Sequence, residues 1–143
     1  MTFLLDSSAL VKLYLFESGQ EEIRALIGEV EIVAVTAIAY PETRAGLAAA
    51  FRQRRIDERQ LSTARLDLEQ DWQRFYEIPV TGRLCREAGQ MAEAFALRGY
   101  DSVHLAAYAE LSRRSQPQPE LITFDRQLAE AATQWLRQFR RER

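Results

Sequence analysis

The chain has 143 residues, of which 47% are hydrophobic and 28% are charged, and its formal net charge is −2 at pH 7. This hydrophobic content argues against wholesale disorder, and the length predicts a single domain covering residues 1–143. The charge by itself gives no reason to expect a nucleic-acid-binding protein. A single cysteine, Cys85, excludes a disulfide framework and a cysteine-based zinc pattern, and we expect it to be a small buried side chain in a helix.

The first residues predict neither a secretory signal nor a membrane anchor. The run from Met1 to Asp6 has no basic n-region and meets an acid after a few apolar residues. We therefore expect a cytoplasmic protein that does not associate with a membrane.

Short apolar runs alternate with helical patterns along the chain. The runs predict strands at Thr2–Leu5, Glu31–Thr36, Ile78–Val80 and Leu121–Phe124. Apolar residues at helical spacing predict helices over 23–30, from about 57 to 75, over 84–95 with a stop near Gly99, and over an amphipathic stretch at 102–114 that ends before Pro117. Strands separated by helices indicate an α/β fold: a three-layer α/β/α arrangement with a central parallel sheet of four to five short strands.

The segment from Thr36 to Arg55 is helical in composition but contains Pro41. Proline is tolerated in the first turn of a helix, because the N–H that it lacks would have no helical partner there. We therefore expect the helix to begin near Tyr40 and to carry Glu42 in its first turn, close to the carboxyl end of the second strand.

Acidic residues recur where an apolar run passes into a helix. Asp6 and Asp125 follow the first and last predicted strands, and Asp101 opens a helical stretch. Parallel strands bring their carboxyl ends to one edge of the sheet, where ligands bind in open α/β folds. Carboxylates gathered there repel one another unless a cation lies between them, and a divalent cation with oxygen ligands is the simplest solution.

The residues around these acids resemble the PIN-domain ribonucleases, and in particular the VapC-type toxins of bacterial toxin–antitoxin pairs. The similarity covers nearly the whole chain, and its specificity comes from the order and spacing of the motifs. The four motifs are Asp6-Ser7-Ser8-Ala9-Leu10, Ala39-Tyr40-Pro41-Glu42-Thr43, Arg98-Gly99-Tyr100-Asp101-Ser102 and Thr123-Phe124-Asp125-Arg126.

This resemblance implies a PIN-like fold, a Mg²⁺ or Mn²⁺ site, and endonucleolytic cleavage of RNA by a water that the metal activates. Asp6 and Asp101 are the expected direct metal ligands. Glu42 and Asp125 are expected to bind the same ion or a second one, or to orient its water. Attack by water would leave a 5′-phosphate and a 3′-hydroxyl.

Several polar residues near the motifs have both a functional and a structural interpretation. The hydroxyls of Ser8 and Thr123 could hold a carboxylate or a metal-bound water, or they could act only as caps. For His104, the only histidine, a buried and hydrogen-bonded structural role is favoured over a general base. Arg98 and Arg126 could contact substrate phosphate or remain surface charges.

The resemblance also implies a cognate antitoxin protein and a homodimer. The segment from Ala9 to Phe16 is apolar nearly all round, which predicts that a partner helix, a second subunit or a long loop covers part of it. Eighteen of the 19 basic residues are arginine, and two clusters could guide RNA or could be solvated helix ends: Arg52, Arg54, Arg55 and Arg59, and Arg137, Arg140, Arg141 and Arg143.

An alternative interpretation is a non-catalytic module that keeps the PIN fold and binds RNA or protein without turnover. Other classes with strand-end acids fit poorly. A haloacid dehalogenase would have a second aspartate at the position of Ser8, a receiver domain would have a lysine late in the chain, and no glycine-rich nucleotide loop is present.

Overall fold

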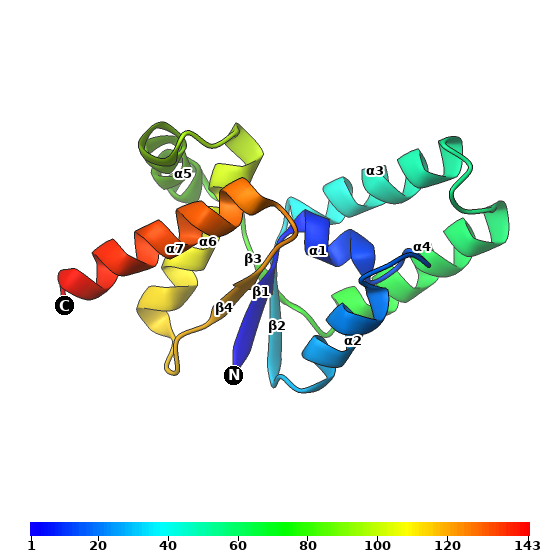
Figure 1. Ribbon diagram of the computed structural model, residues 1–143, viewed down its shortest axis with the longest axis horizontal. Coiled ribbons are helices and arrows are strands. Elements are labelled where there is room, and N and C mark those ends of the chain that lie inside the picture. Colours follow the sequence, from blue (N-terminus) through cyan, green and yellow to red (C-terminus); the bar gives the residue numbers. More distant parts are fainter.

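A four-stranded parallel sheet forms the centre of the protein, and helices cover both of its faces (Figure 1). The computed structural model describes residues 1–143. The strands are β1 (Thr2–Leu5), β2 (Ile32–Thr36), β3 (Tyr76–Ile78) and β4 (Glu120–Ile122), in the order β3-β2-β1-β4. All three neighbouring pairs are parallel, so the strands all point the same way and their carboxyl ends share one edge.

The two faces of the sheet carry two separate hydrophobic cores. Because side chains alternate along a strand, Phe3 and Leu5 point to one face and Leu4 points to the other. The first core contains Phe3, Leu5 and the helices α1 (Ser7–Lys12), α2 (Gln20–Gly28), α3 (Ala39–Arg52) and α4 (Glu58–Trp72). The second contains Leu4 and the helices α5 (Gly82–Phe95), α6 (Gly99–Arg114) and α7 (Arg126–Arg141). The predicted three-layer α/β/α architecture is confirmed.

The helix starts follow from local capping chemistry. Asp6, Asp57, Thr81 and Asp125 each accept a hydrogen bond from a backbone N–H three residues ahead, at the starts of α1, α4, α5 and α7. The helix expected near Tyr40 begins at Ala39 and carries Glu42 in its first turn, with Pro41 where a missing N–H is tolerated.

The predicted boundaries of several elements are wrong by one to three residues. The third strand ends at Ile78 and does not reach Val80, because Pro79 has no N–H to donate to a neighbouring strand. The last strand ends at Ile122, before the site residue Thr123. The first predicted helix ends at Gly28, before Val30, and the long helix ends at Trp72, before Phe75.

Helix α6 is more deeply buried than the amphipathic pattern predicts. It packs against both α5 and α7, and residues 101–109 are buried without interruption. A helix enclosed on several sides has no solvent face that would require polar residues. From Asp101 onward the helix therefore lies in the interior of the fold, and Asp101 and His104 are both buried there.

The prediction that Cys85 is buried is wrong, because its side chain is exposed. On α5 the buried residues are Leu84, Ala88 and Met91, spaced three to four apart. Cys85 lies one position after Leu84, which rotates it about 100° around the helix axis toward solvent.

The surplus of apolar residues between Ala9 and Phe16 is largely covered by the chain itself. Helix α1 ends at Lys12, and Leu13, Tyr14 and Leu15 turn into the core formed with α2, α3 and α4. Only Phe16 remains strongly exposed, at 60%. The chain itself therefore supplies most of the cover, so this segment does not argue for a partner helix or a second subunit.

Two leucines on α4 offer a direct test of this packing. Leu68 is fully buried, whereas Leu66, two residues earlier on the same helix, is 62% exposed. We expect Leu68→Ala to lower the free energy of unfolding by about 2–5 kcal/mol through lost burial and a residual cavity. Leu66→Ala should change it by less than about 0.5 kcal/mol. Urea denaturation measures both, and equal losses would contradict the placement of α4.

Candidate active site

The four predicted acids line one pocket of about 280 Å³ at the carboxyl edge of the sheet. They reach it from different elements: Asp6 follows β1, Glu42 lies in the first turn of α3, Asp101 lies in the first turn of α6, and Asp125 caps α7. Parallel strand direction explains this convergence, since every strand delivers its following residues to the same edge. The remaining lining residues are Ser7, Ser8, Val11, Arg98, Tyr100 and His104.

Asp6 is fixed by hydrogen bonds to both of its carboxylate oxygens. Oδ1 accepts from the Ser8 hydroxyl at 2.7 Å and from the Ala9 N–H at 3.0 Å, and Oδ2 accepts from the Thr123 hydroxyl at 2.6 Å. The two hydroxyls also accept N–H bonds from the backbone of Phe124 and Asp125. Ser8 and Thr123 therefore orient Asp6 and join the end of β1 to the turn that follows β4.

Glu42 lies beside the only histidine of the chain. Its Oε1 is 3.1 Å from His104 Nε2 and accepts a hydrogen bond from the Ser7 hydroxyl at 2.8 Å. The other ring nitrogen, Nδ1, lies 3.4 Å from Thr36 Oγ1. His104 is 1% exposed, so it has the buried, hydrogen-bonded position that the sequence favours. Its partner is nevertheless a site acid, and His104 thereby helps to set the orientation of Glu42.

Arg98 lies between the two remaining acids. Its Nε donates to Asp101 Oδ2 at 3.1 Å, and its Nη2 lies 3.5 Å from Asp125 Oδ2. Asp101 is 6% exposed, whereas the Arg98 side chain is 64% exposed. The guanidinium thus lines the pocket from an exposed position and provides positive charge between two carboxylates that would otherwise repel.

The pKa values of two site acids shift in opposite directions. For Asp101, burial raises the pKa, and the neighbouring Asp125 charge raises it further, more than Arg98 and His104 lower it. For Glu42, burial also acts to raise the pKa, but the hydrogen bonds from His104 and Ser7 outweigh it and leave the pKa below its usual value. The ionised form is therefore disfavoured at Asp101 and favoured at Glu42.

The donor chemistry of the pocket fits a hard divalent cation. Carboxylate oxygens are the ligands that Mg²⁺ prefers, and this ion is usually held by one or two of them together with water. No three acidic or histidine side chains lie close enough together to hold one ion. The residues therefore fit an ion held by at most two carboxylates and completed by water, with Asp6 and Asp101 as the two most buried acids.

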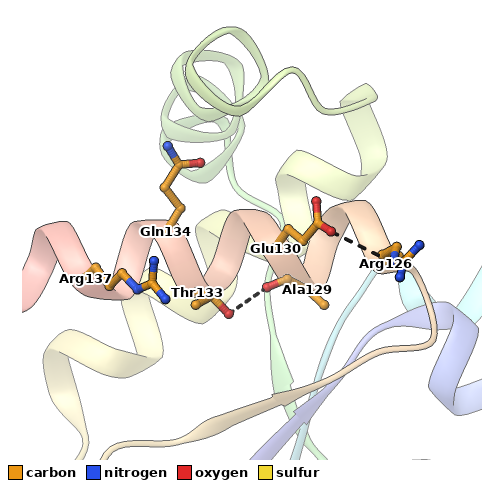
Figure 2. Close-up of a pocket in the computed structure, with 6 residues that line it drawn as sticks. All are labelled: Arg126, Ala129, Glu130, Thr133, Gln134 and Arg137. Atoms are coloured by element: carbon orange, nitrogen blue, oxygen red, sulfur yellow. Dashed lines mark hydrogen bonds and ion pairs between the residues drawn. The ribbon is translucent and has the colours of Figure 1, made fainter.

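A larger hollow of about 610 Å³ follows the outer face of α7, but it has a different chemistry. Figure 2 shows its lining residues, among them Arg126, Glu130 and Arg137. The Arg126 side chain is 94% exposed and lies 3.9 Å from Glu130, so it is a surface charge beside the acidic pocket and does not enter it. With a single acid, this open helix face has no comparable set of metal ligands.

The two arginine clusters lie away from the acidic pocket. One is at the turn between α3 and α4, which project together beyond the sheet, and the other is at the carboxyl end of α7 on the opposite side of the molecule (Figure 1). Their side chains are exposed, and Arg55 pairs with Glu17 at 3.0 Å.

The sequence pattern did not single out two polar residues that hold the site together. Ser7 donates to Glu42, and Thr36 lies against the imidazole of His104. Thr36 could have been found, because it is the last residue of β2 and therefore reaches the edge where the acids gather. Ser7 carries no such signal, since either of two adjacent serines could have turned into the pocket.

The opposite pKa shifts predict opposite stability effects in the metal-free protein. Folding raises the pKa of Asp101, so the ionised form of this residue destabilises the folded protein. This destabilisation is absent at low pH and fully present above the raised pKa. Asp101→Asn should therefore raise the Tm at pH 7. Glu42 stabilises the fold above its unfolded pKa and loses this effect as the pH falls through its lowered folded pKa, so Glu42→Gln should reduce the Tm at pH 7.

Thermal unfolding between pH 3 and pH 7, with a chelator present, measures both differences. Each should shrink toward about pH 3, where the carboxyl groups become protonated. A lower Tm for Asp101→Asn at pH 7, with a normal fold, would contradict the assigned environment of that acid.

No helix of this structure combines the length and the hydrophobicity that a bilayer-spanning segment requires.

Comparison with known proteins agrees with the motif analysis. The family model described as "PIN domain" matches residues 3–134. Ribonuclease VapC45 and Ribonuclease VapC49, both from Mycobacterium tuberculosis, are each 40% identical to the chain over 102 residues, which is 71% of the chain and 71% of each relative. The crystal structure of FitAcB from Neisseria gonorrhoeae aligns with a TM-score of 0.65 at 19% identity, covering 92% of this chain and 93% of that one. The resemblance inferred from the four acidic motifs is therefore confirmed, and the chain belongs to the PIN-domain family, within its VapC-type group.

Proposed function

We propose that this protein is a metal-dependent endoribonuclease that hydrolyses RNA phosphodiester bonds and acts as the toxin of a toxin–antitoxin pair. The observation that carries the proposal is the meeting of Asp6, Glu42, Asp101 and Asp125 in one pocket. The names of the two mycobacterial relatives, both ribonucleases, support the same reaction class. Its site of action, in this proposal, is the cytoplasm.

Asp6 requires little motion before it can bind a metal ion. Asp6 is already held by two hydroxyls and an N–H, so its carboxylate cannot rotate away from the pocket. A Mg²⁺ or Mn²⁺ ion bound by Asp6 and Asp101 would supply an activated water and stabilise negative charge on the phosphate. Glu42, oriented by His104 and Ser7, would position the attacking water, and Asp125 would assist from the other side.

Arg98 has two partners at the solvent side of the pocket and can exchange them. Its guanidinium now bridges Asp101 and Asp125, but the side chain is mostly exposed and therefore free to reorient. When a cation neutralises these acids, the guanidinium becomes available for a phosphate oxygen of the substrate. Attack by water on the scissile phosphorus would yield a 5′-phosphate and a 3′-hydroxyl.

Loss of either proposed metal ligand should abolish cleavage without unfolding the chain. We expect Asp6→Asn and Asp101→Asn to lower the cleavage rate by at least about 100-fold, since each removes charge where the transition state needs stabilisation. Glu130→Gln, which changes an exposed acid of α7, should leave the rate unchanged. Full activity in either Asn variant would exclude the proposed mechanism, and mapping of RNA 5′ ends identifies the product chemistry.

Calorimetric titration separates the enzyme from a non-catalytic module of the same fold. We expect Mn²⁺ to bind the wild-type protein and to bind Asp6→Asn much more weakly. If no metal binds, even with RNA present, the protein is better described as an RNA- or protein-binding module.

We further propose that the protein forms a homodimer and binds a cognate antitoxin, as VapC-type toxins usually do. A two-fold dimer would place a second copy of each arginine cluster on the assembly and so widen its basic surface. We expect sedimentation at micromolar concentration to give twice the mass of one chain. A monomer under these conditions would contradict the dimer but not the nuclease.

A further inference from the structure

Two aromatic side chains remain exposed beside the acidic pocket. Tyr100 is 42% exposed and lines the pocket, and Phe124 is 49% exposed in the turn between Thr123 and Asp125. Neither belongs to the two hydrophobic cores or to the side chains packed against them. Single exposed apolar side chains are common, and what distinguishes these two rings is their position next to the acids of the pocket.

Tyr100 stands at the α6 side of the pocket, directly before Asp101. The guanidinium of Arg98 lies over its ring, 5.0 Å from the ring centre. The same guanidinium contacts Asp101 and Asp125. One arginine therefore joins an exposed aromatic ring to two of the proposed catalytic acids.

Phe124 lies in the turn between β4 and α7, directly before the pocket residue Asp125. Its backbone N–H donates to the hydroxyl of Ser8, which in turn donates to Asp6. The ammonium of Lys12 lies 5.1 Å from its ring centre. A Cβ placed on Gly19 would lie 3.7 Å from the ring, so the backbone at Gly19 also bounds the position of this aromatic group.

Tyr100 and Phe124 thus each pair with a cation, the first pair in the lining of the pocket and the second next to the pocket residues Ser8 and Asp125. Lys12 is the only lysine of the chain and belongs to one of these pairs. A ring offers a stacking surface to any nucleobase, and an adjacent cation offers a contact to the phosphate that accompanies it. The rings would not take part in the hydrolysis itself, but each ring with its cation suits a nucleotide next to the reacting phosphate.

We propose that the Tyr100–Arg98 and Phe124–Lys12 pairs bind the nucleotides on the two sides of the scissile phosphate, with one base stacked on each ring. This inference rests on the proposed ribonuclease function and adds its positioning residues. Tyr100 and Phe124 hold the RNA so that one phosphate lies over Asp6 and Asp101. They take no part in proton transfer.

The test uses a short unpaired RNA with a 2-aminopurine base beside the cleavage position. Tyr100→Leu and Phe124→Leu keep an apolar side chain but remove the stacking surface, and each should raise KM by roughly 10-fold, with a smaller change in kcat. Tyr100→Phe should retain the wild-type KM. Tyr76→Leu is the matched control, because Tyr76 is 54% exposed on β3 and does not line the pocket.

A second readout follows stacking without turnover. In the Asp6→Asn background, binding of the same RNA should quench 2-aminopurine fluorescence, and each Leu substitution should reduce the quench on one side only. Circular dichroism of every variant confirms that it is folded. Wild-type KM and undiminished quenching in both Leu variants would overturn the inference.

Failure of this inference can be distinguished from failure of the nuclease proposal. If the wild type cleaves RNA and the Leu variants match it, only the stacking role is wrong. If the wild type cleaves no RNA, the nuclease proposal fails, and the quenching assay still decides whether the rings bind bases. If the Leu substitutions leave KM unchanged but weaken inhibition by the antitoxin, the rings serve a protein partner and the proposed RNA contact is wrong.

Discussion

Four carboxylates in one small pocket repel one another, and the other residues of the site compensate for this repulsion. Each acid has its own compensating partner. Hydroxyls and an N–H hold Asp6, and His104 and Ser7 hold Glu42. Arg98 lies between Asp101 and Asp125. The compensation is incomplete at Asp101, where burial and, to a smaller extent, the Asp125 charge raise the pKa and so disfavour the ionised form. A divalent cation, which we propose binds here, would neutralise the disfavoured charge of Asp101. The carboxylate that destabilises the metal-free fold is therefore also a proposed metal ligand.

The site lies where the two halves of the protein meet. The α1 and α3 helices, packed on one face of the sheet, supply Ser7, Ser8 and Glu42, whereas α6 and α7 on the other face supply Asp101, His104 and Asp125. The boundary between these two groups of helices lies at the carboxyl ends of the strands (Figure 1). The contact between His104 and Glu42 therefore connects helices from the two faces of the sheet, and the hydrogen bond from Thr123 to Asp6 joins the ends of the neighbouring strands β4 and β1. Catalytic geometry of this kind depends on the packing of both cores.

The rim of the pocket complements its interior. Inside are carboxylates suited to a divalent cation, which would in turn bind a phosphate, and beside them are two aromatic–cation pairs suited to bases and their phosphates. Arg98 belongs to both, because it contacts two acids and an exposed ring at once. The large arginine clusters lie further out, at the α3–α4 turn and at the end of α7, where they could act only on more distant parts of an RNA.

The sequence by itself determined the family, the three-layer architecture and the four acids, because motif order and strand–helix alternation are properties of the linear chain. Parallel strand direction then predicted that Asp6, Glu42, Asp101 and Asp125 would meet at one edge. Only the tertiary structure decided which partner each acid takes, since Ser7, Thr36 and Arg98 reach their partners through packing between distant segments. It also decided burial. Cys85 faces solvent by its angle on α5, and the residues after α1 are covered by the chain's own helices, because side-chain burial depends on which elements pack together and not on local pattern alone.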